Sequence, residues 1–145
     1  MIDRFDAEAG FLSNFAPSPI AWRGVTWATV EAAFQAAKTD SPEEAEKIRR
    51  AATPGKAKRL GRKVVLRSGW EAVKIPVMLA LVRLKFAQNP ALAAQLVATA
   101  NQELVEGNSW GDTFWGVCDG EGRNELGKIL MLVRSEIAGT PGAPA

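Results

Sequence analysis

The chain has 145 residues, 47% of them hydrophobic and 23% charged, which is long and apolar enough for one globular domain with a buried core. Its 18 basic and 16 acidic residues leave a net charge of +2, which excludes a generally basic nucleic-acid or membrane surface. Histidine is absent and Cys118 is the single cysteine, so an intramolecular disulfide is excluded and any chemistry must use carboxylates, lysine or backbone groups.

The first half of the chain is predicted to hold a short hairpin and three helices. Tryptophans and a glycine within residues 20–29 favour the hairpin. Thr29 is suited to cap a first helix, and residues 41–44 (Ser-Pro-Glu-Glu) have the capping-box spacing that starts a second helix running to about Ala52. Residues 54–62 are expected to form a short basic helix.

The second half is also expected to be mainly helical. Proline is tolerated in a first helical turn and breaks an interior one, so Pro76 predicts a single turn over residues 70–74 and a separate helix over 75–87. The Asn-Pro pair at residues 89–90 predicts a further helix that ends near Thr99.

Two extended segments and a last helix complete the predicted fold. Residues 103–106 and 113–118 are expected to be short strands or extended. Apolar residues at three- and four-residue spacing predict a helix after Asn124. We therefore expect a single compact α+β domain, mainly α, over residues 1–139, followed by a flexible tail at 140–145.

The first predicted helix carries its polar side chains on one narrow line. Glu31, Gln35 and Lys38 lie within an arc of roughly 60°, and small or apolar residues cover the rest. Glu31 and Lys38 are about 10 Å apart along the axis, which is too far for an ordinary helix ion pair. This pattern predicts a mostly enclosed helix that presents an acid, an amide and an amine to a shared space. The alternative is that the line of polar residues simply touches water.

Residues 106–116 form a second unusual cluster, in which two tryptophans and three glycines surround Asp112. Such a loop suits a wall that stacks on a flat ring while the backbone comes close. Trp110 and Trp115 could instead anchor the core, and Asp112 could cap a turn. Asn124 is expected to cap the last helix, or alternatively to bind a sugar.

Basic residues cluster at and after the start of the helix predicted at 54–62. Free backbone N–H groups and the helix dipole favour an anion such as phosphate there, although a solvated surface would carry the same charges. The cluster consists of Lys56, Lys58, Arg59, Arg62 and Lys63. Phosphate-loop, dinucleotide, paired-cysteine and serine-elbow motifs are absent from the sequence.

Several blocks in a fixed order resemble the YbiA-like, or NADAR, family over nearly the whole chain. They are residues 11–15, 29–38, 53–58, 85–86 with 88–90, 110–116, and 124–131 with Arg134. The resemblance implies a mostly helical α+β fold and N-glycosidase chemistry on ribosyl compounds. One branch cleaves phosphorylated riboflavin-pathway intermediates, and another removes ADP-ribose from guanine in nucleic acid. Many members carry histidine or tyrosine after the helix-one glutamate, where this chain has Ala32 and Ala33.

Residues and resemblance together imply cleavage of a sugar–nitrogen bond. Positive charge develops on the anomeric carbon, so Glu31 or Asp112 would stabilise it or activate water. Lys38 would assist electrostatically or attack the sugar through its neutral amine. Trp110 and Trp115 would stack on the substrate. The other expected substrate-binding residues are Ser13, Asn14, Phe15, Gln35, Arg59, Gly111, Gly116 and Asn124.

The expected partner is a ribosyl phosphate or an ADP-ribosyl group, the latter carried on DNA or RNA. The alternative is a non-catalytic ADP-ribose or NAD-binding module. Neither a metal nor a cofactor is expected. The first residues do not resemble a secretory signal, and no apolar run approaches the eighteen or so residues that span a bilayer, so we expect a cytoplasmic protein that does not bind membranes.

Overall fold

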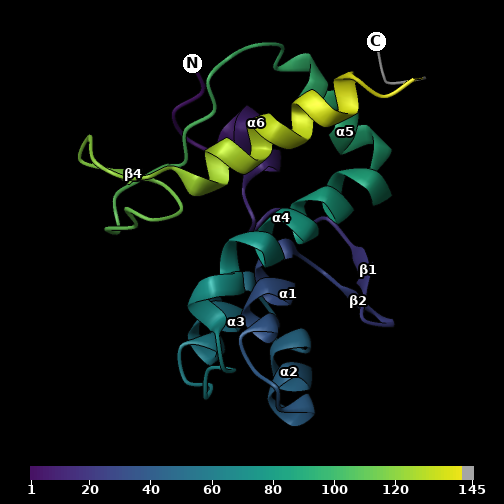
Figure 1. The fold of residues 1–145 in the computed structure, drawn as a ribbon, viewed down its shortest axis with the longest axis vertical. Helices are drawn as coiled ribbons and strands as arrows, with labels where there is room; N and C mark the ends of the chain where they lie inside the picture. The colour runs from purple at the N-terminus through teal and green to yellow at the C-terminus, as the bar shows by residue number, and fades with distance from the viewer. Residues whose placement is uncertain (142–145) are drawn as a thin grey trace. The chain divides into compact units, whose positions relative to one another are not determined.

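The computed structural model describes residues 1–141, so residues 142–145 of the expected tail lie outside the described residues. The chain packs as two compact units, described here separately: a central unit, Asn14–Gln88, and a terminal unit, Met1–Ser13 with the chain from Asn89 onward. The fold is α+β and mainly helical with a few short strands, as expected (Figure 1). Over the described residues, no helix is both long and apolar enough to cross a bilayer.

The central unit is built around its first helix. Its elements are β1 (Ile20–Trp22), β2 (Val25–Trp27), α1 (Val30–Ala37), α2 (Pro42–Arg49), α3 (Pro54–Gly61) and α4 (Trp70–Gln88). β1 and β2 pair antiparallel through a turn in which Arg23 and Gly24 have φ of 53° and 78°, as tight hairpin turns require. Helix α1 contacts α2, α3, α4 and β2, so it lies at the centre of this unit (Figure 1).

The N-terminal caps predicted for the first two helices are present, and α3 has one of the same kind. In each, a hydroxyl oxygen accepts a hydrogen bond from a backbone N–H that the helix itself leaves unpaired, which fixes where the helix begins. Helix α2 ends at Arg49, a little before the expected end near Ala52. The capped pairs are Thr29 with Ala32 at 3.1 Å, Ser41 with Glu44 at 3.3 Å, and Thr53 with Lys56 at 3.1 Å.

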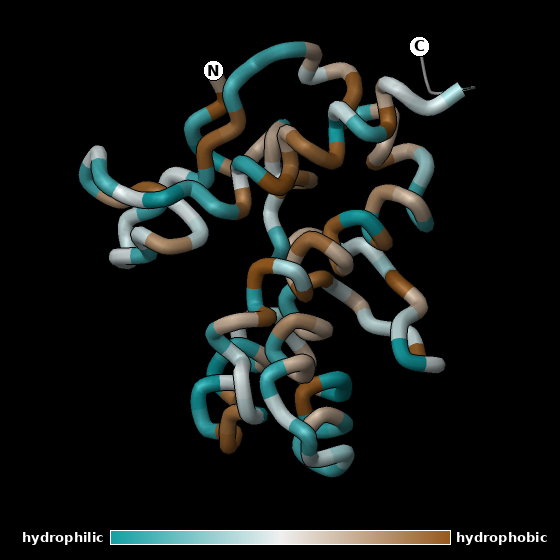
Figure 2. The backbone as a smooth tube through the Cα atoms, viewed as in Figure 1, coloured by the Kyte–Doolittle hydropathy of each residue, from teal (hydrophilic) through white to brown (hydrophobic). Residues whose placement is uncertain are grey.

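Helix α4 corrects one prediction, because it runs unbroken through Pro76. The sequence predicted separate helices over 70–74 and 75–87. Pro76 is exposed, whereas Trp70 before it and Phe86 well after it are buried. Packing on both sides of the proline therefore outweighs its local cost, about 3 kcal/mol in a helix interior. Figure 2 shows hydrophobic segments recurring along this helix.

The terminal unit holds the remaining helices and a second pair of strands. Its elements are the 3₁₀ helix η1 (Ala7–Leu12), α5 (Pro90–Ala98), β3 (Gly107–Asn108), β4 (Val117–Cys118) and α6 (Glu125–Ala138). Helices α5 and α6 contact each other. The helix predicted after Asn124 is present, and its Leu126, Leu130 and Val133 are buried.

The strands of this unit are shorter than expected. β3 and β4 pair in parallel and have two residues each. Of the two segments predicted to be short strands or extended, 103–106 lies outside the named strands and 113–118 contains β4 at its end. Leu104 instead forms an isolated parallel bridge with Ile2. Two backbone hydrogen bonds of 2.8 Å hold this bridge, Ile2 N–H to Glu103 O and Val105 N–H to Ile2 O.

Candidate functional site

Helix α1 is enclosed, as its sequence predicted, because all eight of its residues are buried. Glu31 is 7% exposed and Gln35 is 4% exposed, while Lys38 at the C-terminal cap is half-buried. The Glu31 backbone N–H donates to the Asn14 carbonyl at 3.1 Å, so the residue after Ser13 closes the start of the helix. Glu31 and Gln35 are therefore shielded from bulk water, whereas Lys38 is partly exposed.

Glu31 and Gln35 are joined directly. The Gln35 Nε2 donates to the Glu31 Oε1 at 2.8 Å, across one turn of the helix. The Gln35 Oε1 is buried and has no hydrogen-bond partner. Gln35 was expected to bind a substrate hydroxyl; in this structure its N–H group is engaged by the carboxylate.

Burial changes the chemistry of Lys38. Desolvation lowers the pKa of its amine, nearby Glu31 raises it, and the cations Lys58, Arg62 and Lys74 lower it further, with a net shift downward. The Lys38 Nζ lies 5.9 Å from the centroid of the Phe34 ring, which provides part of the apolar surroundings. A larger fraction of this amine is therefore neutral near pH 7 than for an ordinary lysine.

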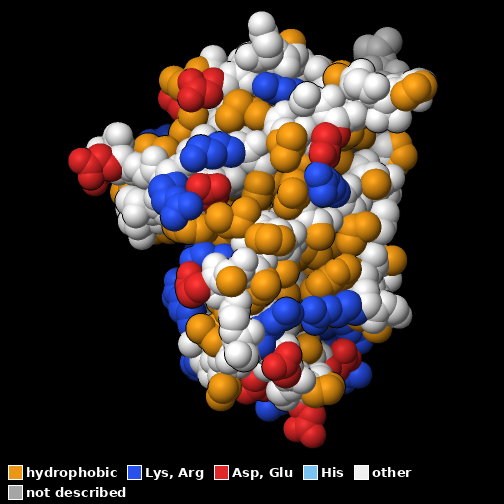
Figure 3. All heavy atoms as spheres, viewed as in Figure 1, with side chains coloured by type: hydrophobic (Ala, Val, Ile, Leu, Met, Phe, Trp, Pro, Cys, Tyr) orange, Lys and Arg blue, Asp and Glu red, His pale blue; other side chains and the backbone are white. Residues whose placement is uncertain are grey.

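The cations near Lys38 come from two helices of the central unit. Lys58 lies on α3, Arg62 is the C-terminal cap of α3, and Lys74 lies on α4. Arg59 of α3 is not among the charges that shift the pKa of Lys38. Figure 3 shows Lys and Arg side chains gathered on the visible face over the central unit. This positive surrounding favours an anionic ligand.

Two residues of the first motif lie in the same unit. The Asn14 Nδ2 donates weakly to the Met78 Sδ at 3.5 Å. Phe15 is 41% exposed, and the Lys58 Nζ lies 6.0 Å from its ring centroid. An exposed aromatic ring beside an ammonium group is suited to a ligand that combines a flat ring with a phosphate. Ser13 itself is the C-cap of η1 in the terminal unit.

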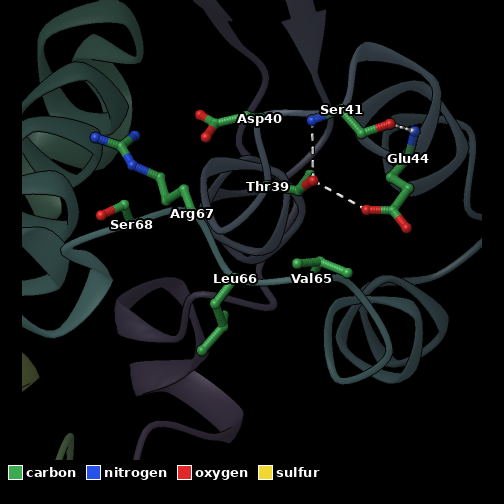
Figure 4. Close-up of a pocket in the computed structure, with 8 residues that line it drawn as sticks. All are labelled: Thr39, Asp40, Ser41, Glu44, Val65, Leu66, Arg67 and Ser68. Carbon is green, nitrogen blue, oxygen red and sulfur yellow. Dashed lines mark hydrogen bonds between the residues drawn. The ribbon is translucent and has the colours of Figure 1, made fainter.

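A pocket of about 270 Å³ lies next to Lys38 rather than around it. Its wall residue Arg67 donates its backbone N–H to the Lys38 carbonyl at 2.7 Å. Figure 4 shows a hydrogen-bonded chain on one side of it, in which the Thr39 Oγ1 donates to the Glu44 carboxylate at 2.9 Å and accepts from the Ser41 N–H. The pocket is lined by Thr39, Asp40, Ser41, Glu44, Val65, Leu66, Arg67 and Ser68, none of which the sequence marked as site residues.

Asp112 caps a turn of the terminal unit, the alternative that its sequence left open. Its Oδ1 accepts hydrogen bonds from the backbone N–H groups of Phe114 at 3.1 Å and Trp115 at 2.9 Å. Asn108 braces the same loop, because its Nδ2 donates to the Asp112 carbonyl at 2.8 Å and its Oδ1 accepts from the Asp112 N–H at 3.0 Å. Sequence reasoning missed Asn108, whose only local signal is its place in a Gly/Asn-rich turn.

The aromatic and glycine residues of this loop differ in exposure. Trp110 is 64% exposed, so it does not anchor a core. Trp115 is half-buried and packs edge-on against Phe114, with 4.8 Å between the two ring centroids. Gly111 has a φ of 87°, a conformation that favours glycine. Gly116 is buried so closely against Glu106 that a Cβ would overlap the Glu106 carbonyl. Both glycines therefore have structural reasons to be present.

The expected capping role of Asn124 is wrong. Its side chain makes no cap hydrogen bond to α6. Instead, Nδ2 donates to the Leu104 carbonyl at 2.9 Å and Oδ1 accepts from the Glu106 N–H at 3.0 Å. The residue adopts φ 54°, which asparagine tolerates better than most residues, and its side chain lies against Gly127 in the first turn of α6, where an added Cβ would overlap it.

The predicted site residues thus fall into two groups, one in each unit. The central unit holds Asn14, Phe15, Glu31, Gln35, Lys38 and Arg59, and the terminal unit holds Ser13, Trp110, Gly111, Asp112, Trp115, Gly116 and Asn124. Sequence reasoning also missed Lys74 and Gly61 of the central unit. Gly61 touches Gln35, and its one sequence signal is a glycine inside a helical pattern.

Comparisons with known proteins show the family and the fold of the chain. The family model of the NADAR domain matches residues 3–138. N-glycosidase YbiA of Escherichia coli (strain K12) is 44% identical over 132 residues, which are 89% of this chain and 82% of that protein. A riboflavin biosynthesis protein of Vibrio vulnificus is 45% identical over 91% of this chain, which spans only 36% of that longer protein. The NMR structure of E. coli YbiA matches with a TM-score of 0.83 at 41% identity, covering 95% of this chain and 87% of that one.

Proposed function

Because the chain belongs to the NADAR domain family, we propose that it hydrolyses the N-glycosidic bond of a phosphorylated ribosyl compound from the riboflavin pathway. The chain is an N-glycosidase, as its relative of comparable length is named. The observation that carries the proposal is the line formed by the buried Glu31 and Gln35 on α1 and the half-buried Lys38 at its C-terminal cap, which brings a carboxylate near an amine with a lowered pKa.

Glu31 is the carboxylate we assign to the reaction. Breaking a sugar–nitrogen bond develops positive charge on the anomeric carbon, and a buried carboxylate stabilises that charge more strongly than a solvated one. The Glu31 side chain is held by Gln35 and lies close enough to Lys38 to raise the pKa of that amine. Asp112, the other candidate, already uses one carboxylate oxygen to hold its turn.

Lys38 is the nucleophile we assign. Its neutral amine attacks the anomeric carbon, the carbon–nitrogen bond to the base breaks, and the base leaves with a proton. The ring oxygen then takes the proton of the new amine as the sugar opens, which gives a Schiff base. Water hydrolyses that bond, releasing the free sugar and restoring the amine. A lowered pKa supports this route, because only the unprotonated amine attacks.

The phosphate is proposed to bind among Lys58, Arg62 and Lys74, with the flat base beside Phe15. These cations act on Lys38 from two helices, so an anion near the amine would meet positive charge from both. The name of the Vibrio relative, a riboflavin biosynthesis protein, supports the choice of pathway. The stacking roles of Trp110 and Trp115 and the hydroxyl contacts of Ser13, Asn14 and Asn124 stay predictions.

ADP-ribose linked to guanine in DNA or RNA is the second candidate substrate. The cations that suit a sugar phosphate also suit a nucleic-acid backbone, and the resemblance to the family implies both activities. The salt dependence of binding distinguishes the two candidate substrates. Binding of a nucleic-acid strand weakens steeply as ionic strength rises, and binding of a small phosphate weakens less. A non-catalytic ADP-ribose or NAD-binding module would bind its ligand without releasing product.

Incubation with each substrate separately tests the proposal. Purified protein is mixed with the ribosylaminopyrimidine phosphate or with DNA carrying ADP-ribosylated guanine, and released sugar is measured by mass spectrometry. Ribose 5-phosphate from the first substrate alone supports the proposal. ADP-ribose from the second alone would replace the proposed substrate with the nucleic-acid one. Tight binding without product over hours would overturn catalysis and favour the binding module.

A further inference from the structure

Gly61 and Gln35 belong to different helices but share one space. Gly61 is the last residue of α3 and is buried. A Cβ added at Gly61 would overlap the Gln35 Oε1 and lie 2.7 Å from its Cδ, well inside van der Waals contact. The absence of a side chain at Gly61 is therefore what lets the Gln35 side chain lie against α3.

The backbone of α3 does not itself call for glycine at this position. Gly61 is not among the glycines with positive φ, and it is helical, where glycine is a poor choice. Gly55 in the same helix is different, because an added Cβ there would meet only the Thr53 Oγ1 at 3.9 Å, an ordinary contact. Space for Gln35 is the feature of the structure that accounts for glycine at position 61.

The orientation of the Gln35 amide follows from the charge of Glu31. Nε2 donates to the Glu31 carboxylate, which leaves Oε1 buried and without a hydrogen bond. A buried unpaired carbonyl carries a desolvation penalty. The reverse orientation would place that oxygen against a carboxylate oxygen, where both are acceptors. The amide N–H thus donates to the carboxylate, and the amide oxygen is left without a hydrogen bond.

Charged groups on the elements around α1 also act on this region. At the C-terminal cap of α1 this group is Lys38, which interacts with Glu31. Helix α2 contributes Glu44, bonded to Thr39, and β2 contributes no titratable group. The cations that act on Lys38 are Lys58 on α3, Arg62 at the C-terminal cap of α3 and Lys74 on α4. A variant that changes only Gln35 leaves all of these charges in place.

We propose that Gln35 and Gly61 form a positioning pair, in which Gly61 leaves the space that fixes the Gln35 amide and that amide holds the Glu31 carboxylate ionised and in one orientation. This proposal rests on the proposed function, because the proposed function gives Glu31 its role in the reaction. Neither residue is assigned contact with the reacting atoms, so both act through Glu31.

Gln35→Met tests the hydrogen bond, because methionine has a similar volume and no donor. A hydrogen bond to a charged group favours the charged form, so its loss makes protonation of Glu31 easier. The acid limb set by protonation of Glu31, which is separate from the rise in rate set by Lys38, is expected to move to higher pH, with a drop in kcat/KM of about tenfold on that limb and little change in KM. The ¹³C titration of the Glu31 carboxyl, assigned with Glu31→Gln, should move in the same direction.

Gly61→Ala tests the space, and Gly55→Ala is its matched control. Gly61→Ala is expected to lower Tm and to move the acid limb as Gln35→Met does, while Gly55→Ala leaves both unchanged or raises Tm slightly. In a Gln35→Gly background the added Cβ meets neither the amide nor the Gln35 Cβ, which otherwise lies 2.9 Å away, so the Gly61→Ala loss in Tm should largely disappear. The acid limb should not be restored in that double variant.

Two outcomes would overturn the positioning pair. The first is that Gln35→Met leaves both the titration midpoint of Glu31 and the Glu31 acid limb at their wild-type pH. The second is that the Gly61→Ala variant is as stable as the Gly55→Ala variant. The NMR titration needs no turnover, so it decides on the pair even if neither substrate is cleaved. Absence of turnover with a displaced titration would reject the proposed function and keep the pair.

Discussion

The backbone N–H of Glu31 donates to the backbone carbonyl of Asn14 at 3.1 Å. This bond joins two motifs that lie far apart in the sequence, the segment at residues 11–15 and the first helix. It pairs one of the N–H groups that a helix start leaves free, alongside the Thr29 cap. The position of the Glu31 backbone is therefore set from outside its own helix.

Lys38 is expected to form a covalent adduct during turnover. Because its pKa is lowered, mainly by burial, the rate should rise with pH up to that pKa and level off above it, at lower pH than for an exposed lysine. Borohydride added during turnover should reduce the Schiff base and add the sugar mass to Lys38. Lys38→Arg should abolish the adduct, whereas Lys56→Arg, at an exposed residue of α3, should retain it. An unmodified Lys38 during rapid turnover would contradict the amine route.

Lys85 should make stability depend on pH above neutrality. Burial lowers the pKa of its amine from 10.5 to about 7. Between these values the unfolded chain binds more protons than the folded one, so stability rises as pH rises from about 7 to 10.5 and is lost as pH falls back. The slope should be on the order of 1 kcal/mol per pH unit. Urea unfolding at several pH values gives the free energy of unfolding of wild type and of Lys85→Met, and the difference between the two measures this slope. Lys56→Met is the exposed control. A difference that stays flat over this window would show that Lys85 keeps an ordinary pKa.

Asn124 is expected to contribute to stability through its side chain. Replacing it with glycine keeps the positive φ accessible but removes the bonds to Leu104 and Glu106. The loss should be about 2–4 kcal/mol, since one buried and one part-buried backbone group lose their partners. Chemical denaturation measures it, and Asn101→Ala at an exposed site should stay within about 0.5 kcal/mol of wild type. Wild-type stability in Asn124→Gly would show that these bonds contribute nothing.

The loop around Asp112 should stay ordered in Asp112→Asn and lose order in Asp112→Ala. Asparagine keeps the Oδ1 that accepts from Phe114 and Trp115, whereas alanine removes it. Limited proteolysis within residues 107–116 should be roughly tenfold faster in Asp112→Ala than in wild type and nearly unchanged in Asp112→Asn. If both variants were cleaved equally fast, and faster than wild type, the carboxylate charge rather than the turn would order the loop.

Features set by neighbouring residues could be predicted from the sequence. The caps at Thr29 and Ser41 and the hairpin at 20–29 depend on contacts a few residues apart, and all are present. The enclosure of α1 followed from its narrow polar line. These signals are local in the chain and need no knowledge of packing.

Features set by packing could not be predicted. The unbroken helix through Pro76 depends on burial at both of its ends. The space that Gly61 leaves for Gln35 involves another helix, and the bonds of Asn124 reach residues eighteen and twenty positions away. Strands of two residues are too short to leave a periodic pattern. The choice between capping and catalysis for Asp112 likewise required the geometry of its turn.

The most direct test of the central claim is the turnover of Glu31→Gln on the ribosylaminopyrimidine phosphate, measured as ribose 5-phosphate released. Glutamine keeps the side-chain size and an oxygen for the Gln35 N–H, so the fold should hold and far-UV circular dichroism with Tm can check it. Glu43→Gln, at an exposed residue of α2, is the control and should match wild type. We predict that Glu31→Gln lowers kcat by about 100-fold or more. A kcat within about threefold of wild type in the folded variant would contradict an acid/base or charge-stabilising role for Glu31.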